Sequence, residues 1–340
     1  MTIHMNLGED SYDIIVQRGV LGEADKHLDL NRRVLVVTDS GVPAQYARTV
    51  AEQCKEAMIL TVEQGEASKS LEVFGKLLSA MLDGGFSRKD CVVAVGGGVV
   101  GDLSGFAASA YMRGIDFYNI PTTLLSQIDS SIGGKTAINF GGVKNIVGAF
   151  YQPKKVLIDP ELLKTLPKRQ ISSGLAEAVK MALTSDKELF DIFENKDIGS
   201  SIDEIIVRSL NIKKNVVEQD EKESGLRKIL NFGHTVGHGI ESSEGMNDLY
   251  HGECVALGMI PMCGEGIRGR LIEVLKKCGL YRELEYDWEK IAEAAFHDKK
   301  ADGNTVTVTT VSEAGSFEMK KMGCLEVIER AKTVLEGLKS

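Results

Sequence analysis

The chain has 340 residues, of which 43% are hydrophobic and 26% are charged, and its formal net charge is −9. A chain of this length usually exceeds one hydrophobic core, so two domains are expected. The negative charge argues against nonspecific binding to nucleic acids or membrane surfaces, and no apolar run has the length of a membrane span. The six cysteines show no CxxC spacing and the first residues lack a secretory pattern, which together predict a cytoplasmic protein.

The first half of the chain alternates predicted strands and helices. Residues 1–20 alternate weakly and predict one or two strands, whereas residues 32–39 form a β-branched run typical of a buried parallel strand. This run ends in Asp39, an acid suited either to bind the ribose hydroxyls of a nucleotide or to cap the next helix. The elements expected next are a helix over 44–56, a strand over 57–62 and a helix from about residue 70.

A glycine-rich turn at residues 96–101 is the clearest cofactor signal. The apolar run CVVAV leads directly into Gly96, Gly98 and Gly101, which fit the pattern GxGxxG, and a helical segment follows. Glycines let the backbone approach a pyrophosphate, and a helix N-terminus offers N–H groups and the positive end of its dipole. The pattern predicts a dinucleotide site, with a tight strand–helix turn as the purely structural alternative.

A second glycine-rich segment, residues 130–158, is basic. It contains the letters GGKT, but Asp129 stands where the P-loop of a nucleoside triphosphatase requires glycine, so that class of enzyme is rejected. The segment has four lysines and no carboxylate: Lys135, Lys144, Lys154 and Lys155. Lysines beside glycines favour groups that face an anion over a solvated basic surface.

Long helical periodicity replaces the alternation after residue 159, which predicts domains of 1–159 and 160–340. Glu177 and Lys180 are three residues apart on the first long helix, and we expect a surface ion pair between them. Residues 304–320 alternate with period two and predict a hairpin. The expected helices are 168–183, 186–195, 201–218, 234–244, 251–269, 271–278 and 287–296.

Histidines and carboxylates gather between residues 234 and 253, namely His234, His238, His251, Glu241, Glu244 and Glu253. His234 and His238 are four residues apart, which places them on one face of a helix. Imidazoles with a nearby carboxylate are the usual ligands of a catalytic zinc with one open position, and ordinary packed histidines are the alternative. Together the three signals predict a dehydrogenase-like enzyme acting on an anionic alcohol.

Seven ordered motifs between about residues 35 and 303 resemble the 3-dehydroquinate synthase family of the shikimate pathway. They are GGGVVGDLSGFAASAYMRG, PTTLLSQIDSSIGGKTAIN, KNIVGAFYQP, TLPKRQISSGLAEAVK, LRKILNFGHTVGHGIE, YHGECVALGM and HDKKADG. The resemblance implies a Rossmann-like α/β NAD-binding domain followed by a mainly α-helical metal-binding domain, in a homodimer. It also implies the conversion of 3-deoxy-D-arabino-heptulosonate 7-phosphate to 3-dehydroquinate and phosphate.

In that family the reaction uses NAD as a true catalyst. A ring hydroxyl is oxidised to a ketone, which acidifies the neighbouring C–H so that phosphate can be eliminated. The ketone is then reduced again, and the opened ring closes as a carbocycle by aldol addition.

Carried over by position, the resemblance implies three groups of site residues. A zinc or cobalt ion would be bound by Glu177, His234 and His251. NAD would be bound by Asp39, Glu66, Lys69, Gly97, Gly98, Asp102, Thr122 and Thr123, with Lys135 and Lys144 beside it. The anionic sugar phosphate would meet Arg113, Asp129, Lys135, Lys144, Asn145, Lys180, Lys213, Arg227, Asn231, His238 and one of Lys299 and Lys300. Arg227 would clamp the carboxylate.

Three other classes of protein are weighed against this family. A polyol dehydrogenase of the glycerol dehydrogenase type would share the glycine turn and the histidine ligands but would not need the basic groups. A cyclase that makes 2-deoxy-scyllo-inosose would need no carboxylate clamp, and Arg227 and Asn231 favour the carboxylated substrate. A non-catalytic NAD-binding protein would not need the full polar set.

Overall fold

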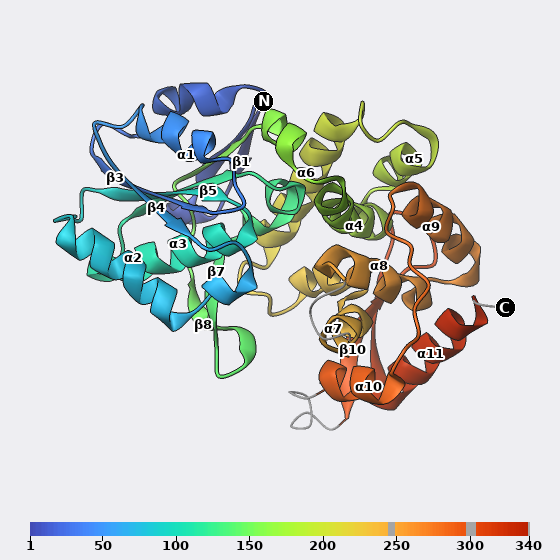
Figure 1. The fold of residues 1–340 in the computed structure, drawn as a ribbon. Coiled ribbons are helices and arrows are strands. Elements are labelled where there is room, and N and C mark those ends of the chain that lie inside the picture. Colours follow the sequence, from blue (N-terminus) through green and yellow to red (C-terminus); the bar gives the residue numbers. More distant parts are fainter. Residues whose placement is uncertain (244–248, 297–303, 339–340) are drawn as a thin grey trace. The chain divides into compact units, whose positions relative to one another are not determined.

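The computed structural model describes residues 1–243, 249–296 and 304–338. It forms two compact units, Met1–Leu166 and Pro167–Ser340 (Figure 1). The predicted boundary after residue 159 falls before the short 3-10 helix Pro160–Thr165, which belongs to the first unit. Asp159 caps this helix and also accepts hydrogen bonds from the backbone N–H groups of Gly19 and Leu21, at 2.9 and 3.2 Å, which ties the connection to the first unit.

The first unit is built on a seven-stranded sheet with the order β1-β2-β9-β6-β5-β3-β4. Neighbouring strands are parallel except for the antiparallel edge pair β1–β2. The strands are β1 (Thr2–Met5), β2 (Tyr12–Val16), β3 (Arg33–Asp39), β4 (Glu56–Val62), β5 (Cys91–Gly96), β6 (Asp116–Pro121) and β9 (Lys155–Ile158). The predicted buried strand is thus confirmed as β3.

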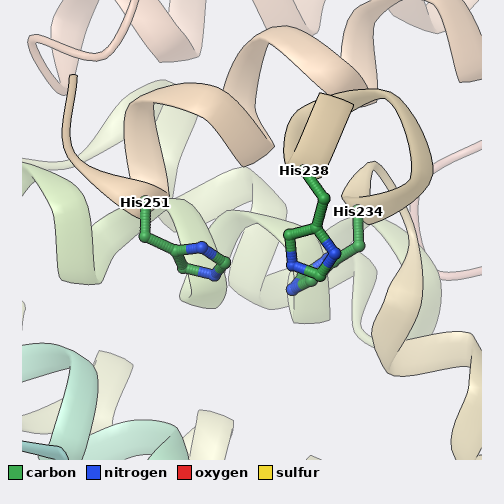
Figure 2. A group of neighbouring side chains, drawn as sticks. All are labelled: His234, His238 and His251. Atoms are coloured by element: carbon green, nitrogen blue, oxygen red, sulfur yellow. The ribbon is translucent and has the colours of Figure 1, made fainter. Parts of the chain in front are cut away.

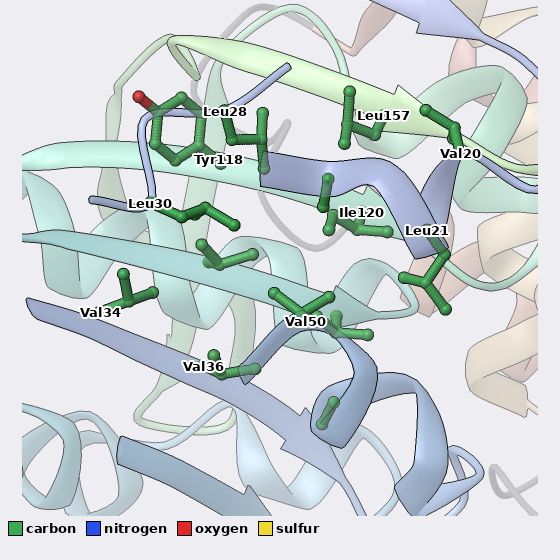
Figure 3. Close-up of a cluster of buried hydrophobic side chains, with 14 of the residues drawn as sticks. Val20, Leu21, Leu28, Leu30, Val34, Val36, Val50, Tyr118, Ile120 and Leu157 are labelled. Carbon is green, nitrogen blue, oxygen red and sulfur yellow. The ribbon is translucent and has the colours of Figure 1, made fainter. Parts of the chain in front are cut away.

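Both faces of this sheet are covered. Val34 and Val36 of β3 pack in one buried cluster with Val50 of α1 (Ala44–Ala51), shown in Figure 3. Leu35 and Val37, the alternate residues of β3, pack in a second cluster with α2 (Leu71–Asp83) and α3 (Gly98–Ala110). A strand buried on both faces has no polar alternation, which is why the apolar runs predicted a parallel α/β sheet correctly.

A two-stranded hairpin in the first unit was not predicted. It consists of β7 (Lys135–Phe140) and β8 (Val143–Phe150), paired antiparallel. Gly141 and Gly142 form its turn with φ of 60° and 81°, the left-handed values that a two-residue hairpin turn needs. The sequence did not reveal this hairpin, because β8 is largely exposed and carries no apolar alternation.

The second unit is mainly helical, as predicted, with a small hairpin of β10 (Thr305–Thr310) and β11 (Glu318–Gly323). Neither unit contains, among the residues that the structure describes, a helix long and apolar enough to cross a membrane. The helices are α4 (Lys168–Ser185), α5 (Lys187–Asn195), α6 (Ile202–Gln219), α7 (His234–Ser243), α8 (His251–Met262), α9 (Glu265–Lys277), α10 (Trp288–Phe296) and α11 (Cys324–Gly337).

The prediction of one helix over 251–269 is wrong. The chain leaves α8 at Cys263, which is extended and forms a bridge with Val311. The N–H of Gly264 donates to the Val311 carbonyl at 2.8 Å, and α9 then begins at Glu265. This break depends on a partner segment far along the chain, so helical periodicity alone did not reveal it. The helix α11 was also not predicted.

Candidate metal and cofactor sites

Glu177 and Lys180 lie on one face of α4 and form a buried ion pair, with 1% and 2% of their surfaces exposed. The expectation of a surface pair is therefore wrong, because α4 is buried along most of its length. Burial opposes the charge of Glu177 and raises its pKa. The positive charges of Lys180 and His251 outweigh this effect and hold the pKa well below the ordinary value, so the carboxylate is ionised.

Two imidazoles face the same oxygen of this carboxylate. The Nε2 atoms of His234, at the start of α7, and His251, at the start of α8, each lie 3.7 Å from Oε1 of Glu177. Oε1 has no hydrogen-bond partner among the described residues. Two ligand atoms that each lie about 2.1 Å from a tetrahedral ion are about 3.4 Å apart. The three atoms therefore fit a divalent ion after a small adjustment, and Lys180 can remain on Oε2.

The Nδ1 atoms of His234 and His251 each face a hydrogen-bond acceptor. Nδ1 of His251 lies 3.0 Å from Oε2 of Glu241, and Nδ1 of His234 lies 3.2 Å from the Phe232 carbonyl. Both acceptors favour a proton on Nδ1, which turns Nε2 of each ring toward Glu177. Glu241 was noted in the sequence only as a nearby carboxylate. Its position two helical turns after His234 is the signal that could have assigned it to the site.

The two imidazoles differ in charge when no metal is bound. Burial lowers the pKa of His234 well below its ordinary value, and the positive charge of Lys180 lowers it further, so this ring is neutral. Burial also opposes the charge of His251, but the nearby carboxylates of Glu177 and Glu241 raise its pKa to about 9. A metal ion must therefore displace a proton from His251 at neutral pH.

His238 offers an alternative ligand set. Its ring is exposed and lies one turn after His234 on α7, with ring centroids 5.1 Å apart. Figure 2 shows the three histidine rings approaching one another from two helices, and one nitrogen from each lies within 4.8 Å of the others. Both possible ligand sets share His234 and His251, so the choice is between Glu177 and His238. Glu244 lies outside the described residues.

Two predicted substrate groups of the second unit, Arg227 and Asn231, lie in the segment that follows α6. The carboxylate of Asp220 accepts hydrogen bonds from the backbone N–H groups of Gly225 and Arg227, at 2.7 and 2.9 Å. Arg227 is buried with 2% exposure, and its guanidinium donates to the Glu221 carbonyl. Asn231 donates to Glu223 at 2.8 Å. Glu223, which has a φ of 60°, was not predicted as a site residue.

The other predicted substrate groups are divided between the two units. Lys213 is buried on α6 of the second unit, and Lys299 and Lys300 lie outside the described residues. In the first unit, Arg113 ends a 3-10 helix after α3, Asp129 lies in the short π-helix Ser126–Ser130, and Lys135 and Lys144 lie on β7 and β8.

The glycine turn has the predicted strand–helix setting. β5 ends at Gly96 and α3 begins at Gly98. A Cβ atom on Gly97 would lie 3.1 Å from Thr123, and one on Gly98 would lie 3.0 Å from Ser130. The N–H of Thr122 donates to the Gly96 carbonyl at 2.9 Å and joins the two predicted cofactor segments. These close approaches explain the glycines and leave a partly exposed backbone turn at a helix N-terminus.

Lys69 connects the remaining predicted cofactor residues. Its Nζ donates to Asp102 at 2.7 Å and to the side chain of Asn145, and it lies 3.8 Å from Glu66. Asn139, which was not predicted, donates to Glu66 at 2.9 Å. The network thus joins residues assigned to NAD with Asn145, which was assigned to the substrate.

Asp39 ends β3 and closes the next turn. Its Oδ1 accepts a hydrogen bond from the N–H of Gly41 at 2.8 Å. Pro43 occupies the N-cap of α1, so the helix-cap alternative for Asp39 is wrong.

Comparisons with known structures agree with this fold. A 2-deoxy-scyllo-inosose synthase complexed with carbaglucose-6-phosphate, NAD+ and Co2+ is 26% identical, with a TM-score of 0.89 over 98% of this chain and 100% of that one. The 2-epi-5-epi-valiolone synthase of Streptomyces hygroscopicus, with NAD+ and Zn2+ bound, is 29% identical, with a TM-score of 0.86 over 98% and 99%. A probable glycerol dehydrogenase from Sinorhizobium meliloti, at 16% identity and a TM-score of 0.64 over 96% and 97%, shares the fold alone.

Sequence comparisons identify the family. Residues 59–173 match the family model of the 3-dehydroquinate synthase N-terminal part, and residues 174–301 match that of the C-terminal part. The 3-dehydroquinate synthase of Streptococcus thermophilus is 41% identical over 97% of this chain and 99% of its own. That of Pelobacter propionicus is 41% identical over 87% and 89%. The chain belongs to the 3-dehydroquinate synthase family.

Proposed function

We propose that this chain is a 3-dehydroquinate synthase. It converts 3-deoxy-D-arabino-heptulosonate 7-phosphate to 3-dehydroquinate and phosphate, with NAD and a zinc or cobalt ion as cofactors. The similarity to 3-dehydroquinate synthases over nearly the full chain carries this conclusion. The NAD+ and Co2+ or Zn2+ bound to the two related cyclases support the choice of cofactors.

The metal would be held by Glu177, His234 and His251. The buried, ionised carboxylate with an open oxygen favours Glu177 over the exposed His238 as the third ligand. When bound, the ion supplies Lewis acidity toward a hydroxyl oxygen of the substrate. Lys180 places a second positive charge beside the same carboxylate and is suited to stabilise developing negative charge on oxygen.

The substrate would be bound through its two anionic ends. The buried guanidinium of Arg227 is the carboxylate clamp, because arginine can bind a carboxylate through two parallel hydrogen bonds. His238, which is exposed next to the metal ligands, is a phosphate partner or a proton carrier. The other proposed substrate groups are Arg113, Asp129, Lys135, Lys144, Asn145, Lys213, Asn231 and one of Lys299 and Lys300.

NAD would bind at the glycine turn of the first unit. The backbone at Gly97 and Gly98 would face the pyrophosphate at the N-terminus of α3. The other proposed contacts are Asp39, Glu66, Lys69, Asp102, Thr122 and Thr123, with Lys135 and Lys144 beside the cofactor. We also propose that the enzyme works as a homodimer in the cytoplasm.

A substrate panel tests the proposed function. Purified protein with NAD and zinc should release phosphate from the heptulosonate phosphate, and much more slowly from a hexose phosphate that has no carboxylate. Glycerol should give no steady increase in NADH absorbance. Steady NADH formation with glycerol and no phosphate release would show a polyol dehydrogenase instead.

A further inference from the structure

A buried carboxylate lies two residues after the proposed metal ligand His251. Glu253 of α8 has no exposed surface. Arg169 of α4 donates to both of its oxygens, from Nε to Oε1 at 2.9 Å and from Nη2 to Oε2 at 2.8 Å. Arg282 donates to Oε1 at 2.9 Å, and the N–H of Tyr250 donates to Oε2 at 2.9 Å. Both oxygens are engaged, so this carboxylate is not a metal ligand, although its sequence position suggested one.

Gly252, the residue before Glu253, fixes α8 to α4 at a second point. The N–H of Gly252 donates to the hydroxyl of Ser173 at 3.1 Å. A Cβ atom on Gly252 would lie only 2.0 Å from the Ser173 carbonyl oxygen, so the two helices meet here with no room for a side chain. Ser173 lies one turn before Glu177 on α4, and Gly252 directly follows His251. The contact therefore sets the distance between these two ligands.

We propose that Glu253, Arg169 and Arg282 form a positioning cluster for the metal site. The cluster holds the first turn of α8 against α4, and thereby keeps Nε2 of His251 at the open oxygen of Glu177. In this role the three residues act through the position of His251 and are not themselves metal ligands. The inference rests on the proposed function, because it requires that Glu177 and His251 bind the same ion.

Arg169 is well placed for this role because it lies on the same helix as Glu177. Its two parallel hydrogen bonds to Glu253 restrict both the position and the rotation of α8. His251 itself is held by Glu241 of α7, which orients the ring but does not join it to α4. Loss of the cluster should therefore let the two ligands separate even when the helices remain folded.

The alternative is that the cluster only stabilises the fold. Removal of one partner from a buried ion pair is destabilising wherever the pair lies. Metal affinity and thermal stability must therefore be measured separately. A matched control is the pair of Glu194 and Arg270, which joins α5 to α9 through two parallel hydrogen bonds at 2.7 and 2.6 Å. Neither of those helices carries a proposed ligand.

The experiment measures zinc affinity of the metal-free full-length protein by competition with a chromophoric chelator. Glu253→Gln and Arg169→Met should weaken zinc binding about 10- to 100-fold, the range found when groups that orient metal ligands are removed. Arg282→Met should have a smaller effect, because the bonds from Arg169 remain. Glu194→Gln should keep wild-type zinc affinity. The visible spectrum of bound Co2+ should change in Glu253→Gln and Arg169→Met but not in Glu194→Gln.

Wild-type zinc affinity and an unchanged Co2+ spectrum in both Glu253→Gln and Arg169→Met, with only a lower melting temperature, would overturn the inference. If Glu253→Gln does not fold, Arg169→Lys keeps the charge but loses the two parallel bonds, and it should still weaken zinc binding. Failure of the unsubstituted protein to bind zinc would instead overturn the proposed metal site itself.

Discussion

Replacement of His251 by alanine should empty the metal site, whereas replacement of His238 should leave it occupied. In the proposed site Nε2 of His251 lies 3.7 Å from the open oxygen of Glu177, and His238 lies outside the ligand set. Four protein ligands of a structural zinc share about 10–16 kcal/mol of binding free energy, or roughly 2.5–4 kcal/mol each. Loss of one such ligand should raise the dissociation constant for zinc by about two to three orders of magnitude.

The assay is the zinc content of each variant after dialysis, together with its zinc affinity and its rate of phosphate release. His251→Ala should lose zinc and activity together. His238→Ala should keep its zinc and lose turnover or substrate affinity, and His4→Ala, at an exposed histidine of the first unit, should change neither. If His238→Ala loses its zinc and Glu177→Gln retains it, the three histidines are the ligands and the assignment of Glu177 is wrong.

Two further predictions concern pH and the cofactor. The folded-state pKa of His251, about 9, is above its ordinary value of 6.5, because the nearby carboxylates of Glu177 and Glu241 outweigh the effect of burial. Protonated His251 therefore stabilises the metal-free protein fully below pH 6.5, and this stabilisation is lost as the pH rises through 9. The free energy of urea unfolding should decline over this pH range in the wild type and not in His251→Ala. Lys69→Met removes a buried positive charge that donates to Asp102, and it should weaken NAD binding about 10- to 100-fold by calorimetry. Lys76→Met, which breaks an exposed ion pair on α2, should leave NAD binding unchanged. Equal affinities in these two variants would refute the assignment of Lys69.

Local patterns in the sequence predicted the elements of the first unit that are buried on both faces. The apolar runs of β3 and β5 and the glycines after β5 are short-range signals, and the structure confirms the strand–turn–helix arrangement that they predicted. The hairpin β7–β8 was missed because β8 is mostly exposed and its residues show no apolar alternation. Exposure removes the apolar alternation on which such a prediction depends.

The candidate site depended more on distant contacts. Spacing alone favoured His234 and His238 as a metal pair, and only the family resemblance separated them by assigning Glu177 and His251 to the metal. Spacing also gave no sign that Glu177 and Lys180 are buried, because burial is decided by helices packed from other parts of the chain. The engagement of Glu253 by two arginines was hidden for the same reason.

The most direct test of the synthase assignment is the number of phosphate ions released per NAD. A synthase that reoxidises its own NADH in every cycle should release many equivalents of phosphate from the heptulosonate phosphate with substoichiometric NAD, and NADH absorbance should stay flat. Phosphate release that stops after one equivalent per NAD, or that rises in step with NADH, would contradict the account.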